Sequence, residues 1–161
     1  MDERKVVFHH WMEGLKMFGY QFGIGLLFGA VAIVLDVLVG CDTRNIFALI
    51  SGVLGTHLYS LNTERKRPGV LSKSAHKVGF ANAVIQIGTA LPLTLALMVM
   101  RSVSQYGTEL PFDAGAILFV SAFTIVVGLP ICYAIARLGI WSGVRMANDD
   151  ARQYSGSAVL S

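Results

Sequence analysis

The sequence predicts an all-α membrane protein, an antiparallel bundle of four transmembrane helices with a short N-terminal interfacial helix. Three observations point to this fold. Only 14% of the 161 residues are charged, whereas an ordinary soluble domain has about 25%. Four runs of 19 to 23 residues contain no Asp, Glu, Lys or Arg. The basic residues between these runs lie almost entirely on one side of the membrane that the runs define.

The charge-free runs set the length and position of each span. At a rise of 1.5 Å per residue, they cover roughly 28 to 35 Å, which matches a hydrocarbon core of about 30 Å. They are apolar all round, unlike the one-sided helices of a soluble bundle. We expect one transmembrane domain over residues 1–148 and a flexible polar tail over 149–161. The predicted spans cover about residues 17–39, 45–63, 78–100 and 114–136.

Charge asymmetry predicts the orientation of the spans. Eleven of the 13 Lys and Arg residues lie before the first span, between the second and third, or after the fourth. Only Arg44 and Arg101 lie in the two opposite loops. The positive-inside rule therefore predicts that both termini are cytoplasmic. The net charge of +3 is explained by contact with the lipid bilayer, so we expect no nucleic acid partner.

Two segments at the cytoplasmic side are predicted to have structure of their own. Before the first span, apolar and charged residues alternate around Trp11, as in a helix that lies at the membrane interface. After Pro68 and Gly69, a helix is expected to lead directly into the third span, with Ser72 or Ser74 as its N-cap.

A short first hairpin is followed by a distinctive end of the second span and a basic central loop, with the residues Leu58, Tyr59, Ser60, Leu61, Asn62, Glu64, Arg65, Lys66, Arg67 and Pro68. This loop and the layout of the spans resemble a group of uncharacterised four-span inner-membrane proteins of Gram-negative bacteria. The resemblance implies a multi-pass protein of the bacterial inner (plasma) membrane and carries over no activity.

Polar residues inside the spans are the candidates for function, because their burial in hydrocarbon costs free energy unless they find partners. Asp36, about one turn from the outer surface, is expected to pair with Arg44 or Arg101, or to bind a cation or proton if it faces a cavity. His57 is expected to form a structural hydrogen bond with Gln21 or Tyr20, which lie at the same depth of the antiparallel hairpin.

Asn82, Gln86 and Thr89 follow one another at spacings of four and three, which places them on one face of the third span. The simplest interpretation is hydrogen bonding between helices. The alternative is a polar path for a ligand.

Glycines recur at short spacings in the first two spans, a pattern that allows helix backbones to approach closely in lipid. They are predicted to pack the first hairpin or, alternatively, to form a face for self-association. The residues concerned are Gly19, Gly23, Gly25, Gly29, Gly52 and Gly55.

Catalytic motifs are missing from the sequence: it contains no phosphate-binding glycine loop, nucleophile elbow or His-Glu-x-x-His. We therefore expect no enzyme, no catalytic residue, no cofactor and no metal site. The favoured function is association through helices, as a homo-oligomer or as an accessory subunit of a membrane assembly. The alternatives are a small transporter or channel lined by the third span, and a membrane enzyme acting on lipid or quinone.

Overall fold

The computed structural model describes residues 3–40, 44–106 and 114–157 of the chain, and nearly all of these residues are helical. The elements are α1 (Glu3–Val39), α2 (Arg44–Lys66), α3 (Val70–Tyr106), α4 (Ala114–Phe123), the π-helical turn η1 (Thr124–Gly128) and α5 (Leu129–Ser157). The last three, α4, η1 and α5, follow one another without a break.

Three helical segments are long and apolar enough to cross a membrane. They are His9–Leu38 in α1, Val70–Arg101 in α3, and Gly115–Gln153, which runs through α4, η1 and α5. The structure therefore confirms an all-helical protein whose helices are suited to a membrane.

Helix α2 is shorter and more polar than these segments, although it spans the second predicted range. It packs between α1 and α5. Its small polar side chains, Ser51, Thr56, Ser60 and Thr63, are buried. The two neighbouring helices therefore shield these polar side chains of α2.

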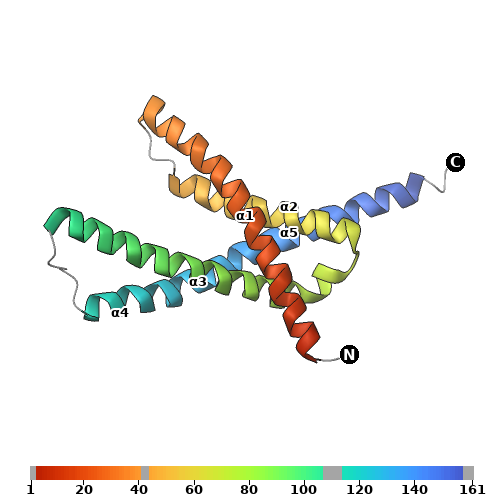
Figure 1. Ribbon diagram of the computed structural model, residues 1–161. Coiled ribbons are helices and arrows are strands. Elements are labelled where there is room, and N and C mark those ends of the chain that lie inside the picture. The colour runs from red at the N-terminus through yellow and green to blue at the C-terminus, as the bar shows by residue number, and fades with distance from the viewer. Residues whose placement is uncertain (1–2, 41–43, 107–113, 158–161) are drawn as a thin grey trace.

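The helices form two hairpins that cross near the middle of the molecule (Figure 1). On the left of the picture, the C-terminal end of α1 lies near the start of α2, and the end of α3 lies near the start of α4. Both termini and the turn from α2 to α3 lie toward the right. Successive long helices therefore run in opposite directions across the picture.

The hydrophobic core lies at the crossing, on the side of the α2–α3 turn. Burial of large apolar side chains there is complete or nearly so, which stabilises the packing of α1, α2, α3 and α5. The cluster consists of Met17, Tyr59, Leu71, Ala75, Val78, Ala136 and Ile140.

Toward the hairpin ends the packing is much looser. Beyond Ile87 the described side chains of α3 are half-buried or exposed, and in α4 the large side chains Leu118 and Phe119 are 69% and 70% exposed. Among the described residues, α4 has extensive contacts only with η1, into which it continues.

The two ends of the chain differ from the sequence-based expectation. The segment around Trp11 forms no separate interfacial helix, because α1 runs without interruption from Glu3 into the first span. The predicted tail from 149 onward is helical up to residue 157. There α5 continues to Ser157, and Asp150 accepts a 3.1 Å hydrogen bond from Nε of Arg65 in α2. Residues 158–161 lie outside the described part of the chain.

The two intramembrane prolines have different surroundings. Helix α3 continues through Pro92. By contrast, the wide turn η1 ends two residues before Pro130. Proline has no N–H and its ring clashes with the carbonyl four residues earlier, here that of Val126 in η1. A π-helical turn at this point widens the helix where that clash would occur.

Candidate functional site

A cluster of uncharged polar side chains joins α1, α2 and α3 inside the bundle. We call these residues, Gln21, Thr56, Asn82 and Gln86, the polar core. Gln21 Nε2 donates to Thr56 Oγ1 at 2.7 Å, and Gln21 Oε1 accepts from Asn82 Nδ2 and Gln86 Nε2 at 3.0 Å each. The Gln21 amide is therefore the centre of the network.

The predicted polar face of α3 is only partly realised. Asn82 is fully buried, and its amide also donates to the carbonyl oxygen of Gly14 at 3.2 Å. Gln86 donates to Asn82 Oδ1 at 2.6 Å. Thr89 does not join them, because it is exposed and its hydroxyl donates to carbonyls of its own helix. The face therefore ends at Gln86.

The expected partner of His57 is wrong. Its Nδ1 lies 2.8 Å from Ser142 Oγ of α5, not from Gln21 or Tyr20 of α1. Gln21 does lie at the depth of His57, since it donates to the adjacent Thr56. The rotation of α2 about its axis turns Thr56 toward α1 and the next residue toward α5, because successive helical residues are about 100° apart.

Asp36 is half-buried in the last turn of α1, where its carbonyl oxygen accepts a 3.0 Å hydrogen bond from Gly40 N. The side chain of Arg44 lies outside the described part of the structure. The expected pairing of Asp36 with Arg44 or Arg101 therefore stays a prediction.

The glycines of the first two spans divide into two sets. A Cβ at Gly55 would lie 2.6 Å from Gln21 Cα, so this glycine allows α1 and α2 to touch. Gly25 faces Ser51 Oγ of α2 more loosely, at 3.7 Å, and Gly52 faces Ile135 of α5 at 3.2 Å. At the remaining three, Gly19, Gly23 and Gly29, an added Cβ would meet no atom of another described helix within 4 Å.

A second close helix contact, between α2 and α5, was not predicted from the sequence. Gly139 of α5 lies directly against the Thr56 side chain, and a Cβ at Gly143 would lie 2.6 Å from the carbonyl oxygen of His57 and 2.8 Å from Ser60 Cβ. Gly139, Gly143 and the buried Ala147 repeat at a spacing of four. This small-residue spacing, the same signal used for the first two spans, was present in the sequence.

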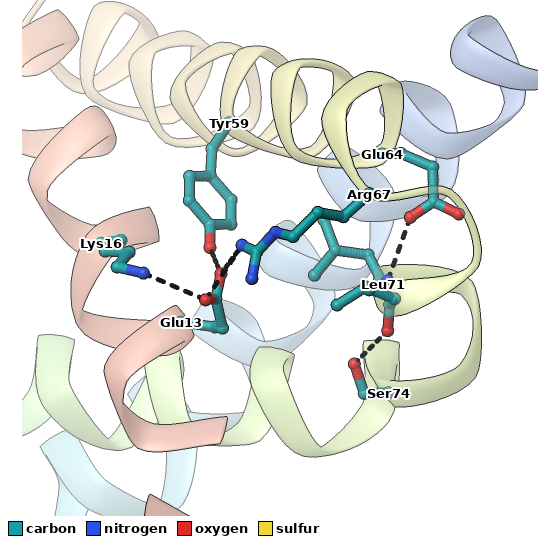
Figure 2. Close-up of polar contacts among 8 residues, drawn as sticks. Glu13, Lys16, Tyr59, Glu64, Arg67, Leu71 and Ser74 are labelled. Carbon is teal, nitrogen blue, oxygen red and sulfur yellow. Dashed lines mark hydrogen bonds and ion pairs between the residues drawn. The ribbon is translucent and has the colours of Figure 1, made fainter. Parts of the chain in front are cut away.

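A buried carboxylate ties α1 to α2 and to the turn after it (Figure 2). Glu13 is 1% exposed. It accepts a hydrogen bond from the Tyr59 hydroxyl, lies 3.1 Å from Lys16 Nζ, and accepts from one Arg67 nitrogen at 3.1 and 3.2 Å. A buried carboxylate requires such partners, because an isolated charge in an apolar interior is very unfavourable. The sequence placed Glu13 only on the polar side of an interfacial segment.

The second buried carboxylate caps α3. Glu64 Oε2 accepts from Leu71 N at 3.0 Å (Figure 2). Its Oε1 accepts from Gly69 N at 2.6 Å. This satisfies backbone donors that the first turn of a helix leaves free. The expected cap by Ser72 or Ser74 is wrong: α3 begins at Val70, and Ser74 Oγ donates back to the Val70 carbonyl at 2.5 Å.

The polar core and the two buried carboxylates support helix packing more directly than they support a chemical reaction. The polar core contains amides and a hydroxyl, whose donors and acceptors are largely used within the chain. The carboxylates of Glu13 and Glu64 are likewise occupied by neighbouring donors. Comparison of the chain with protein-family models, with curated proteins and with solved structures finds no match.

Proposed function

We propose that this chain is a non-catalytic multi-pass protein of the bacterial inner membrane that acts through helix association. In this proposal α2 crosses the membrane as well as the three apolar segments. The chain then has four spans, each antiparallel to the next, and both termini lie in the cytoplasm. The charge distribution supports the orientation, because Arg65, Lys66, Arg67, Lys73 and Lys77 cluster around the α2–α3 turn. The length of α2 supports its role as a span, because 23 residues cover about 35 Å.

The observation that carries the proposal is the lack of packing around α4. Its described apolar side chains are largely exposed, and its contacts within the described chain are essentially those with η1. Helices associate in lipid through van der Waals packing, and α4 supplies a complete apolar helix for such packing. The occupant is a second copy of this chain or another subunit of a membrane assembly.

The transport alternative draws less support from the structure. A path along α3 would require Asn82 and Gln86 to face water or a ligand. Asn82 is fully buried, and both amides bond to Gln21. Opening such a path would break these bonds, each worth about 0.6 to 2 kcal/mol between membrane helices.

Cross-linking in native membranes tests the association proposal. In a variant whose two cysteines are replaced by alanine, L118C places a thiol near the start of α4 and L38C places one near the end of α1, in the other hairpin. Both leucines are exposed, at 69% and 75%. A short membrane-permeable bismaleimide is expected to cross-link L118C, either to twice the chain mass or to one co-purifying subunit at a fixed ratio.

The matched variant decides whether contact at α4 is specific. Equal cross-linking of L38C and L118C would indicate random collision in the bilayer. Failure of L118C to cross-link, together with a monomeric mass in mild detergent, would contradict association through α4.

A further inference from the structure

A pocket of about 470 Å³ lies between the beginning of α3 and the second half of α5. Ser72 and Ala75 form its α3 wall. The α5 wall is formed by Arg137, Ile140, Trp141, Val144, Arg145, Asn148, Asp149 and Arg152. The polar core and the buried carboxylates belong to other parts of the molecule.

The α5 wall carries positive charge along one face. Arg137, Trp141 and Arg145 repeat at a spacing of four, so their side chains lie one above another. The Arg145 guanidinium carbon lies 5.5 Å from the centroid of the Trp141 ring, and the Arg137 chain rests against Gly79 of α3. The contact of Arg137 involves its aliphatic chain, and that of Arg145 involves the face of its guanidinium group. Both arginines therefore keep N–H donors available for a ligand.

No carboxylate among the described residues lies within ion-pair distance of Arg137 or Arg145. Asp149 does line the pocket, but it lies one turn beyond Arg145, toward the end of α5. The pocket is therefore most positive between Arg137 and Arg145. Two guanidinium groups with free N–H donors suit a phosphate, which accepts paired hydrogen bonds from arginine.

The depth of the pocket indicates where the phosphate comes from. Arg137 is the first charged residue after the charge-free run 114–136, at the level where headgroups meet the hydrocarbon. Ala75, Ile140 and Val144 give the pocket an apolar wall, and Trp141 is an aromatic residue of the kind enriched at membrane interfaces. A headgroup phosphate with its glycerol and upper acyl carbons matches this combination of charged and apolar surface.

We propose that this pocket is a binding site for the phosphate headgroup of an anionic phospholipid. Arg137 and Arg145 hold the phosphate, Ser72 and Asn148 supply further polar groups for the headgroup, and Trp141 lies beside the glycerol. Basic pockets between membrane helices bind anionic headgroups in this manner. A volume of about 470 Å³ lies in the usual range of small-molecule sites, about 300 to 1,000 Å³.

Lipid titration of the purified full chain by native mass spectrometry tests the site. Phosphatidylglycerol is compared with phosphatidylcholine that carries the same acyl chains. The unmodified chain is expected to bind the first phosphatidylglycerol at least several times more tightly than phosphatidylcholine. R137Q/R145Q is expected to weaken phosphatidylglycerol binding by roughly tenfold or more, because each basic group near a headgroup contributes substantially to its capture.

The control variant, K66Q/K77Q, also removes two positive charges, but from residues that do not line the pocket. Lys66 lies at the end of α2, and Lys77 lies about half a turn of α3 away from the face that carries Ser72, Ala75 and Gly79. K66Q/K77Q is therefore expected to retain phosphatidylglycerol binding within about twofold. An equal loss in both pairs, or the absence of a lipid preference in the unmodified chain, would overturn the site.

Two further arms keep the result decisive. Should R137Q/R145Q not remain monodisperse, R145Q alone is used, since its side chain lies over an exposed ring, and a loss of roughly three- to fivefold is expected. Inorganic phosphate at millimolar concentration is expected to leave the bound phosphatidylglycerol in place. Displacement by inorganic phosphate would show a site for a free anion and overturn the assignment to lipid.

Discussion

A Cβ placed on Gly143 of α5 would lie 2.6 Å from the carbonyl oxygen of His57 in α2, so the two helix backbones are in direct contact at this point. One turn earlier, Gly139 meets the side chain of Thr56 in the same way. Such close approach is how membrane helices gain packing energy without a hydrophobic driving force between them. The α2–α5 contact is therefore a principal source of stability for the bundle.

Replacing Gly143 with alanine is expected to destabilise the protein by about 1–3 kcal/mol, because the added methyl group forces α2 and α5 apart. The measurement is the midpoint of unfolding by sodium dodecyl sulfate in mixed micelles. G23A is the matched control, since a Cβ there would meet no atom of another described helix within 4 Å. In a helix, alanine is more favourable than glycine by up to about 1 kcal/mol, so G23A is expected to be neutral or stabilising. Similar midpoints for the two variants would contradict the packing role of Gly143.

E13Q is expected to destabilise the fold by about 1–3 kcal/mol, since it removes the negative charge that Lys16 and Arg67 neutralise. The same unfolding assay measures the loss. The control is D150N, which breaks the ion pair between Asp150 and Arg65 near the surface. Exposed ion pairs contribute about 0–1 kcal/mol, so a loss for D150N as large as that for E13Q would argue against a special role for Glu13.

The N-terminus of α3 has two candidate capping residues, Glu64 from the structure and Ser72 from the sequence, and substitution distinguishes them. E64A is expected to cost about 1–2 kcal/mol and to speed amide hydrogen exchange at residues 69–71, because Gly69 N and Leu71 N lose their acceptor. S72A is expected to change neither property, since Ser72 is exposed within α3. Faster exchange in S72A than in E64A would restore the serine cap that the sequence suggested.

The polar core is tested by removing its central amide. Q21L leaves the amides of Asn82 and Gln86 without their shared acceptor and removes the donor to Thr56 Oγ1 and the Gly52 carbonyl, so a loss of about 2–4 kcal/mol is expected from the broken bonds between helices. T89V is the control, because the Thr89 hydroxyl bonds only within its own helix in the described structure. Its expected effect is below about 0.5 kcal/mol. A neutral Q21L would show that the network adds nothing to helix association.

The prediction for Thr89 illustrates how far a spacing pattern reaches. A spacing of three and four places residues on one face of a helix, and the pattern correctly brought Asn82 and Gln86 together. It contained no information on where the neighbouring helix ends its contact. Helix α1 supplies Gln21 at the level of Asn82 and Gln86, and Thr89, almost a turn farther along, is already exposed.

The sequence by itself determined that the chain is helical and suited to a membrane, and approximately where each helix lies. Hydropathy and charge are local properties that add up along a run of residues, so they can be read without knowing the neighbours. The tertiary structure alone decided which polar groups meet: His57 with Ser142, 85 positions away, and Gln21 with Asn82, 61 positions away. These pairs depend on how each helix is rotated about its axis and where it crosses its neighbour. Close packing of Gly139 and Gly143 against α2 fixes the first pair, and close packing of Gly14 against Ala81 and Asn82 of α3 fixes the second.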